Sequence, residues 1–464
     1  MVNKAGSTAY DNKLGDAFTD KLQKPWLLVL TIGLGTLLNP LNSSMISVAL
    51  TRLQFEFELT FADASWLISI FYLASAVGQP VMGKLSDMFG AKRLFMVGLV
   101  LVAVSCLLAP FSPNFIFLLG CRALQAIGSS TLFPSGMSMV RTSISKNQAK
   151  ALAILSIFAN VSAAFGPSVG GFLIAAWDWP SIFMINFPFI VLSFFLAIFV
   201  LPENRGGVFR LKRIDLIGIT IFIGTVIAII LFLLSIEQNV NWWALMVFVV
   251  GAILFYLYET RRTEPFIDFD ALKKDPTVTF IYVQFMTINL VYYCYFFGLP
   301  TFLQQARGYS EEHTGLIMLA LAGFSVIVSP LAGGMIDKYG SKLPMFIGAL
   351  LLLIGTALII TYHQTSPIFW LLIIMAILGM SNGFNNISAQ TALYEHVSAE
   401  NTGSASGLFQ TSRYLGAILS SSLLGVTFND FVDVVHLHLV VIICLVFCLL
   451  IVFLSWKLPG KMIR

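Results

Sequence analysis

The sequence predicts an all-α integral membrane protein that crosses the bilayer fourteen times. Of its 464 residues, 58% are hydrophobic and only 11% are charged, whereas about a quarter of the residues in a soluble domain are charged. About 20 apolar residues in a helix span a bilayer core, and fourteen such segments follow one another along the chain. They are 26–50, 64–84, 94–111, 115–140, 150–176, 182–201, 214–235, 242–258, 278–300, 313–334, 344–362, 368–392, 404–428 and 436–456.

The basic residues predict the orientation of these spans. With the N-terminus inside, 23 of the 27 lysines and arginines lie in cytoplasmic segments, and only Arg52 and Arg307 lie in outer loops. Arg122 and Arg413 fall inside spans. Cytoplasmic loops of membrane proteins carry the excess of Lys and Arg. We therefore expect both termini in the cytoplasm, with an uncleaved first span because that apolar run is too long for a signal peptide.

A short turn rich in glycine occurs twice, which indicates an internal duplication. The first copy follows the second span and the other copy follows the tenth, so each half has six spans and the seventh and eighth are an inserted pair. Five positions match at one offset of 250 residues: Pro80 with Pro330, Gly83 with Gly333, Asp87 with Asp337, Gly90 with Gly340, and Lys92 with Lys342.

The duplication divides the chain into five expected parts. They are a cytoplasmic tail (1–25), an N-terminal six-helix bundle (26–201), a linker with two extra transmembrane helices (202–277), a C-terminal six-helix bundle (278–456) and a second tail (457–464).

Several other classes of protein have no support in the sequence. All five cysteines lie in apolar segments without C-x-x-C spacing, so neither a disulfide framework nor a metal site is expected. No catalytic cluster or phosphate-binding loop occurs, and the net charge of +4 is explained by the cytoplasmic loops. We expect no enzyme activity, no bound cofactor and no nucleic acid, but a monomer in the lipid bilayer with a small-molecule substrate.

Three motifs resemble those of the major facilitator superfamily, in particular its fourteen-span drug:proton antiporter branch. Each falls in the span, or after the span, where the family carries it. They are Gly83-x-x-x-Asp87-x-x-Gly90-x-Lys92-Arg93 after the second span, Arg122-x-x-Gln125-x-x-Gly128 in the fourth, and Gly166-Pro167-x-x-Gly170-Gly171 in the fifth.

The resemblance implies a secondary active exporter of the bacterial plasma membrane. Such a protein would extrude small amphiphilic compounds, such as drugs, by proton antiport with alternating access. A dedicated metabolite exporter or a proton-coupled importer of the same superfamily is the alternative. The proton gradient would supply the energy in place of a cofactor.

The duplicated turn is the candidate conformational latch. Asp87 can meet the positive end of a neighbouring helix, close to Lys92 and Arg93, while Gly83 and Gly90 permit the tight turn and close approach. Such a contact can exist in only one of two rigid-body states, and the resemblance implies that it favours the outward-facing state. Asp337 would act as the second copy. The alternative is an ordinary solvated turn with a capping aspartate.

Arg122 is the candidate coupling residue, because an ionisable group inside a span is costly and commonly functional. The resemblance implies that Arg122 faces a central cavity, with Gln125 almost one turn away. The alternative is a structural arginine bound to carbonyls. In the fifth span, Gly166, Pro167, Gly170 and Gly171 would allow a helix to approach closely; small-residue packing alone explains them, and only the resemblance implies antiport.

The first span departs from the pattern of the antiporter branch. Many members carry an aspartate where this chain has Asn42, which cannot titrate, and no carboxylate lies in the middle of any span. Coupling would then use a peripheral carboxylate, for which Asp63 is the first candidate, or Arg122 with water. For Asp63 itself, the residues favour an ordinary helix cap after Thr60 over a coupling role. A neutral, zwitterionic or anionic substrate is favoured over a purely cationic one.

Polar side chains at membrane depth predict a wet cavity between the halves, because each of them is costly when it faces lipid. For any single asparagine, a hydrogen bond between helices is the alternative. The candidates are Asn39, Pro40, Asn42, Tyr72, Gln284, Asn289, Tyr292, Asn382, Asn385, Asn386, Gln390, Gln410 and Arg413.

Overall fold

The computed structural model describes residues 25–59, 61–144, 148–203, 215–236, 240–262, 265–267, 269–309, 311–363, 365–428 and 432–458, and within these ranges all regular structure is helical. Most of both expected tails and part of the linker (204–214) lie outside the described residues. Every expected span coincides with a helix or a pair of helices. The prediction of an all-α protein is confirmed.

The long helices begin and end close to the expected boundaries. The first span is broken at Leu37 into α2 (Pro25–Thr36) and α3 (Leu38–Glu56), and the sixth begins with the short α8 (Ser181–Met184). The remaining helices are α4 (Phe61–Phe89), α5 (Ala91–Leu108), α6 (Phe115–Ser143), α7 (Gln148–Trp177), α9 (Asn186–Val200), α10 (Leu216–Ser235), α11 (Trp242–Glu259), α12 (Phe269–Lys274), α13 (Pro276–Gln305), α14 (Glu311–Tyr339), α15 (Lys342–Ile359), α16 (Ile368–His396), α17 (Thr402–Phe428) and α18 (Val434–Lys457).

Twelve helices of the described chain are long and apolar enough to cross a membrane. Two of the fourteen expected spans, α7 and α17, are not among them. In α7 only Gln148–Ala163 qualifies, as a shorter apolar helix, and α17 contains many serine, threonine and glycine residues. The structure therefore supports twelve membrane-spanning helices, and the count of fourteen is not established.

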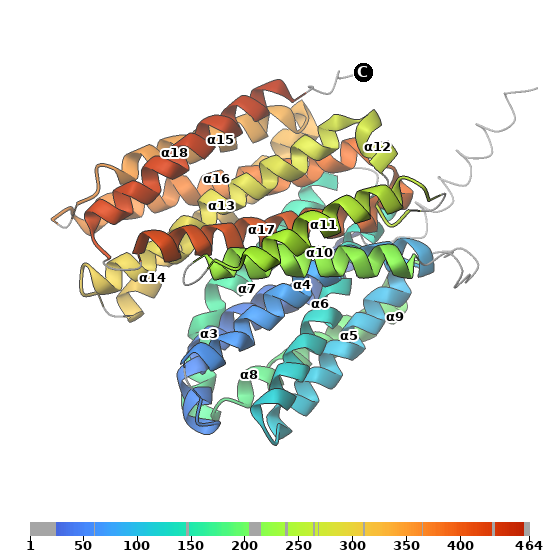
Figure 1. Ribbon diagram of the computed structural model, residues 1–464, viewed down its shortest axis with the longest axis horizontal. Coiled ribbons are helices and arrows are strands. Elements are labelled where there is room, and N and C mark those ends of the chain that lie inside the picture. Colours follow the sequence, from blue (N-terminus) through green and yellow to red (C-terminus); the bar gives the residue numbers. More distant parts are fainter. Residues whose placement is uncertain are drawn as a thin grey trace, which may run out of the picture.

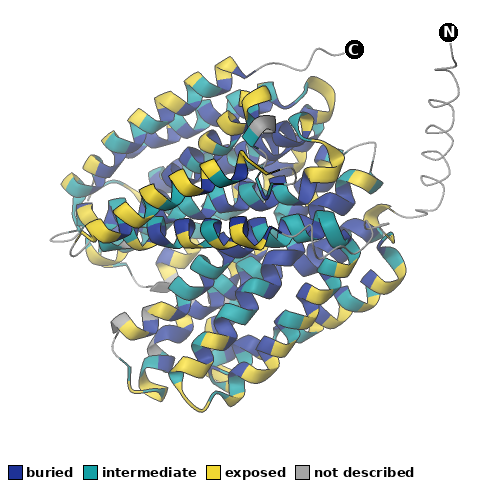
Figure 2. Ribbon diagram, turned by 45° about the vertical axis from the view of Figure 1, so that its right-hand side comes forward, coloured by how far each residue is buried: buried dark blue, intermediate teal, exposed yellow. Residues whose placement is uncertain are grey.

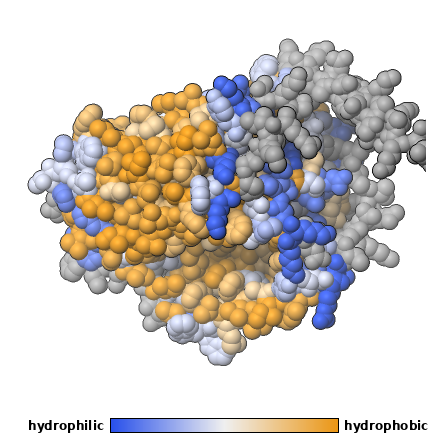
Figure 3. Space-filling model, turned by 90° about the horizontal axis from the view of Figure 1, so that it is seen from above, coloured by the Kyte–Doolittle hydropathy of each residue, from blue (hydrophilic) through white to orange (hydrophobic). Residues whose placement is uncertain are grey.

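Large apolar side chains cover the outside of the molecule, as expected for a protein in lipid. Ile116, Phe199 and Val435 are 80%, 83% and 71% exposed. Figure 3 shows a broad hydrophobic surface, with hydrophilic residues gathered towards one side of the molecule. Figure 2 shows the buried residues concentrated where the helices face one another.

Two helix pairs join the halves, and the duplication relates them to each other. Helix α4 packs against α17, and its counterpart α14 packs against α7. The inserted pair, α10 and α11, pack on each other, and α10 also contacts α4 and α17 (Figure 1). The extra helices therefore lie against the junction between the halves.

The halves share a hydrophobic core at one end, and a smaller cluster joins Ala76 of α4 to Tyr414 of α17 beside α10. At the end that the sequence assigns to the cytoplasm, here called the inner end, Ile336, Leu393 and Phe409 belong to the same core as the N-terminal helices. Towards the other end, residues such as Leu299 and Leu371 form a separate core within the C-terminal half. The molecule is therefore closed at its inner end.

The α4–α17 contact requires glycine at two places. A Cβ atom on Gly407 would overlap the carbonyl oxygen of Gln79 and lie 2.6 Å from Cα of Pro80. A Cβ atom on Gly83 would overlap the carbonyl oxygen of Gly403. Because these neighbours are backbone atoms, they cannot rotate away, and the two helices approach closely only through glycine.

Replacing Gly407 by valine should therefore destabilise the closed inner end. Overpacking of a tight contact costs about 1–3 kcal/mol, so we expect a lower unfolding temperature for the purified variant in detergent. Gly120→Val is the matched control, because no atom lies within 4 Å of a Cβ atom at that position. Equal unfolding temperatures for the two variants would contradict the tight α4–α17 contact.

Candidate functional site

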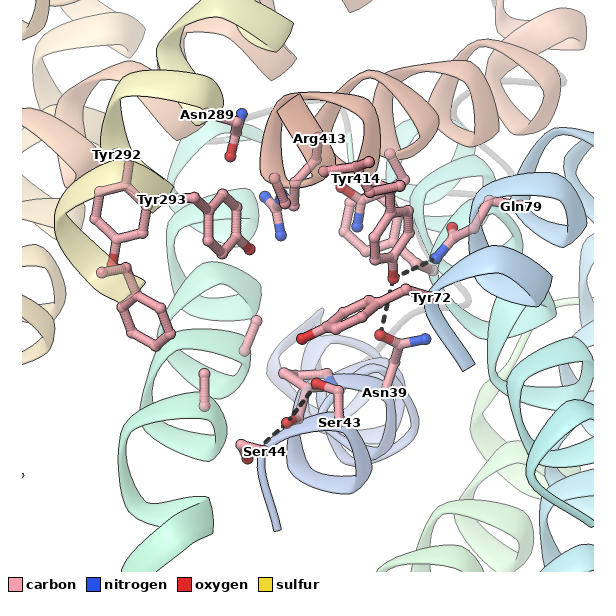
Figure 4. Close-up of a pocket in the computed structure, with 18 of the residues that line it drawn as sticks. Asn39, Ser43, Ser44, Tyr72, Gln79, Asn289, Tyr292, Tyr293, Arg413 and Tyr414 are labelled. Carbon is pink, nitrogen blue, oxygen red and sulfur yellow. Dashed lines mark hydrogen bonds between the residues drawn. The ribbon is translucent and has the colours of Figure 1, made fainter. Parts of the chain in front are cut away.

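A cavity of about 540 Å³ lies between the two halves. Its walls come from α3, α4, α6 and α7 on one side and from α13, α16 and α17 on the other, with Ile230 of α10 beside them. Figure 4 shows side chains from these helices pointing into a common space. The volume falls in the range of small-molecule pockets, about 300–1,000 Å³.

Ten of the thirteen residues predicted for the cavity line it. They come from five different helices, so the fold brings together residues that are far apart in the sequence. They are Asn39, Pro40, Tyr72, Asn289, Tyr292, Asn382, Asn386, Gln390, Gln410 and Arg413.

The other three do not line the cavity, so their placement there was wrong. Each forms hydrogen bonds inside one half instead. Asn42 exchanges hydrogen bonds with Asn186, at 2.9 Å. Gln284 donates to Oγ of Ser455 at 2.5 Å. Asn385 donates to Oγ of Ser381 at 3.1 Å.

Sequence reasoning missed several residues that shape the cavity. The hydroxyl of Tyr414 donates to Oδ1 of Asn39 at 3.0 Å, so this bond crosses from one half to the other. Gln79 lies 3.5 Å from the same hydroxyl, and Tyr293 adds a further ring. The signal available in the sequence was the run of aromatic residues at 292–297.

Among the described residues that line the cavity, Arg413 is the only charged one. Its Nη2 donates to Oδ1 of Asn386 at 2.9 Å, and its guanidinium lies 5.5 Å from the ring centroid of Phe285. The buried Nε atom has no hydrogen-bond partner. The cavity therefore carries a positive charge that no lining carboxylate balances.

Arg122 does not line the cavity, which corrects the expectation that it faces the central space. It is buried in the N-terminal half, where Nη1 donates to Oε1 of Gln125 at 2.5 Å and Nε to the carbonyl of Leu67 at 3.3 Å. The guanidinium also lies 4.5 Å from the ring centroid of Phe71. Carbonyl oxygens and an aromatic face thus stabilise the buried cation.

A chain of hydrogen bonds connects Arg122 to the first span. Gln125 donates to Oδ1 of Asn42 at 3.0 Å, and Asn42 in turn contacts Asn186 of α9. Nη2 of Arg122 has no hydrogen-bond partner. Asn42 is therefore a neutral link in a polar network. Asp63 lies in the first turn of α4 and is not among the cavity residues.

The fifth-span motif packs α7 against α3. A Cβ atom on Gly166 would overlap Oγ of Ser44, which lines the cavity, and one on Gly170 would lie 3.0 Å from Cγ2 of Val48. No atom lies within 4 Å of a Cβ atom on Gly171. The side chain of Pro167 lies outside the described residues. Two of the three glycines therefore allow the close contact.

Asp87 binds the N-terminus of α17 at the inner end. Its carboxylate accepts hydrogen bonds from the backbone N–H of Gly403 at 2.8 Å and from both N–H and Oγ of Ser404 at 2.7 Å. The positive end of a helix dipole stabilises such a carboxylate. The turn that follows needs glycine, because Gly90 and its counterpart Gly340 have φ of 96° and 80°.

The two basic residues of this motif are not bound to Asp87. Lys92 donates instead to the carbonyls of Ile198 and Leu201 at 2.9 and 3.0 Å, where α9 ends. Arg93 is exposed. The placement of Lys92 and Arg93 at the carboxylate was therefore wrong, and Lys92 caps the neighbouring helix.

The second copy of the turn makes the mirror contact. Asp337 lies beside the backbone of Ala149, at the N-terminus of α7. A Cβ atom on Gly333 would lie 3.0 Å from the carbonyl oxygen of Ala149. Each half thus places one carboxylate at the first turn of a helix of the other half.

Arg141 adds a third contact that the sequence did not single out. It lies at the end of α6 and donates to the carbonyls of Tyr394, at 2.5 Å, and Val397, where α16 ends, and to Oγ1 of Thr402 at 3.1 Å. A cation at the C-terminal end of a helix is stabilised by the helix dipole. Arg141 therefore joins the halves at the negative end of a helix, whereas Asp87 joins them at the positive end of a helix.

The chain matches known membrane transporters over most of its length. The sequence profile of the Major Facilitator Superfamily matches residues 32–421. The uncharacterized MFS-type transporter YwoD of Bacillus subtilis is 44% identical over 419 residues, which are 89% of this chain and 92% of that protein.

More distant relatives carry different names. The multidrug resistance protein Stp of Mycobacterium tuberculosis is 27% identical over 86% of this chain and 75% of its own length. The riboflavin transporter RibZ of Clostridioides difficile is 25% identical over 86% of this chain and 88% of its own length. With the family profile covering most of the sequence, this chain belongs to the major facilitator superfamily of membrane transporters.

Proposed function

We propose that the protein exports small amphiphilic compounds from a bacterial cell by alternating access. The observation that carries the proposal is a cavity lined by both halves, in a molecule whose halves share a hydrophobic core at the inner end. A cavity between two rigid bodies can open to either side when the bodies rock against each other. Stp, named for multidrug resistance, supports the class of cargo.

We further propose the fourteen-span arrangement with both termini inside, and a monomer as the working unit. Helix α7 packs between α3 and α14, and α17 between α4 and α13. Both helices thus lie among apolar neighbours, where their polar residues face protein or cavity and not lipid. The inserted helices α10 and α11 form the linker between the halves.

Proton antiport is part of the proposal, with Arg122, Gln125 and Asp63 as its candidate residues. No carboxylate lines the cavity within the described residues, so proton and substrate would not compete for one acidic side chain. The hydrogen bonds from Arg122 through Gln125 to Asn42 connect the arginine to the first span. A change of protonation or hydration near Arg122 could therefore affect the position of that span. RibZ, named as a riboflavin transporter, favours a dedicated metabolite transporter as the second candidate.

Expression in a bacterial host that lacks its own efflux pumps tests the export function. We expect lower accumulation of toxic aromatic compounds than in cells with the empty vector, and we expect a protonophore to abolish the difference. The measurement is the minimal inhibitory concentration together with intracellular fluorescence. Protection against none of the cationic, zwitterionic and anionic compounds would contradict multidrug export.

Replacing Asp87 by asparagine should shift the protein towards the state that is open at its inner end. Hydrogen bonds to charged groups contribute about 1.5–3 kcal/mol each, so losing the charge should change the population ratio tenfold or more, since 1.4 kcal/mol is a factor of ten. The measurement is the labelling rate of a cysteine placed at Ser138, which is buried near the inner end of α6.

Asp433→Asn is the matched control for this experiment. Asp433 also caps a helix, by accepting from the backbone N–H of His436 at 2.9 Å, and hydrogen bonds from His436 hold the pKa of its carboxyl below the usual range. It belongs to the other end of the molecule and should leave the labelling rate unchanged. A labelling rate in the Asp87→Asn variant as slow as that of the protein with Asp87 intact would exclude the latch.

Replacing Arg122 by glutamine or lysine should reduce proton-coupled export by at least tenfold. Lysine keeps the charge but lacks the planar fork that contacts Gln125 and the Leu67 carbonyl together. The measurement is substrate-induced proton release from acidified everted vesicles, with the amount of inserted protein determined in parallel. Wild-type coupling in both variants would show that Arg122 has a purely structural role.

A further inference from the structure

The charge of the cavity is set by one side chain. Among the described residues that line it, Arg413 is charged and none is aspartate, glutamate, lysine or histidine. The described ion pairs include none that neutralises Arg413. A guanidinium stays protonated throughout the physiological pH range. Any compound that enters this space therefore meets a fixed positive charge.

The hydrogen bonding of Arg413 within the protein is incomplete. Asn386 accepts one hydrogen bond, and the face of Phe285 covers the guanidinium on one side. The buried Nε–H has no acceptor. Arg122, the other arginine of the membrane interior, has Gln125 and a carbonyl as acceptors on two of its nitrogens. An anionic oxygen beside Arg413 would supply the missing acceptor and the missing charge.

Aromatic rings surround this cation on the cavity side. Figure 4 shows the guanidinium of Arg413 between Tyr293 and Tyr414, with Tyr292 and Tyr72 further along the walls. Flat rings stack on flat ligands, and phenolic hydroxyls donate to anionic oxygens.

We propose that the cavity selects compounds that carry an anionic group on a flat aromatic body, with the anionic group bound to Arg413. This inference rests on the proposed export function and names its substrate class. A carboxylate or sulfonate would take the place of the absent acceptor at Nε and Nη, and the aromatic body would lie among the tyrosines. Compounds with a permanent positive charge would be repelled, because no carboxylate compensates Arg413.

Fluorescein and rhodamine 123 test the proposal, because they share a three-ring body and carry opposite charges at neutral pH. Binding to the full-length protein in nanodiscs is measured by fluorescence anisotropy. We expect fluorescein to bind at least tenfold more tightly than rhodamine 123. Equal affinities, or tighter binding of rhodamine 123, would overturn the proposal.

Variants then assign the effect to Arg413. Arg413→Gln should weaken fluorescein binding at least tenfold, and Arg413→Lys should weaken it less. Arg261→Gln is the control, because Arg261 is exposed, outside the cavity, and its replacement changes the net charge equally. Fluorescein binding that is unaffected in Arg413→Gln, or weakened equally in Arg261→Gln, would contradict an anion site at Arg413.

A second variant distinguishes the loss of an anion site from the misfolding of the protein. Asn289 lines the cavity beside Arg413 (Figure 4), and Asn289→Asp would place a carboxylate where the guanidinium can bind it. We expect this variant to lose fluorescein binding and to gain binding of rhodamine 123, a reversal that misfolding would not produce. Unchanged preference in Asn289→Asp would contradict control of selectivity by the charge of Arg413.

Measurements of dye transport distinguish a failure of the anionic substrate class from a failure of the proposed export function. In everted vesicles, uptake of fluorescein but not of rhodamine 123 supports both. Uptake of rhodamine 123 alone supports export and overturns the anionic substrate class. Arg413-dependent fluorescein binding without uptake of either dye retains the anion site and contradicts export of these compounds.

Discussion

The closed inner end depends on the contact between the carboxylate of Asp87 and the first turn of α17. Two backbone N–H groups and one hydroxyl, from Gly403 and Ser404, converge on its two oxygens. These donors belong to the half that does not contain Asp87, so the bonds break when the halves separate. The contact therefore lies at the closed inner end and links the two halves directly.

The duplication places a carboxylate on each side of this junction. Asp337 lies beside the first turn of α7, as Asp87 lies beside the first turn of α17. Arg141 contributes through the opposite end of a helix dipole, at the carbonyls that end α16. These polar contacts accompany the apolar core that the halves share at the inner end, which includes Ile336 and Leu393. Polar and apolar contacts therefore hold the inner end closed together.

The sequence predicted the helices and the matched turns well, because both follow from local properties. A long apolar run must be a helix in lipid, since every backbone polar group needs a partner within the segment. A repeat at fixed spacing places two equivalent turns in two equivalent halves. The turn residues Gly90 and Gly340 indeed share a left-handed backbone conformation. Only the binding partners of the carboxylates, on distant helices, required the structure.

The direction in which a polar residue faces could not be predicted in the same way. Asn39 lines the cavity, whereas Asn42, three residues later, is buried against Asn186. In a water-soluble helix the polar stripe marks the solvent side. In a membrane helix, however, a polar side chain avoids lipid equally well in a cavity or in a contact with another helix. Composition therefore identifies residues that avoid lipid and does not reveal what they contact.

Arg122 and Arg413 are both cations in the membrane interior, where a charge needs polar or aromatic partners. Their surroundings supply these partners to different extents. Arg122 is surrounded by Gln125, the Leu67 carbonyl and the ring of Phe71, so the N-terminal half itself stabilises the charge. Arg413 has one amide oxygen and one ring, and it opens onto the cavity. A cation that its own bundle stabilises can position the first span through Gln125 and Asn42. A cation that its bundle stabilises only in part attracts the missing negative charge from whatever enters.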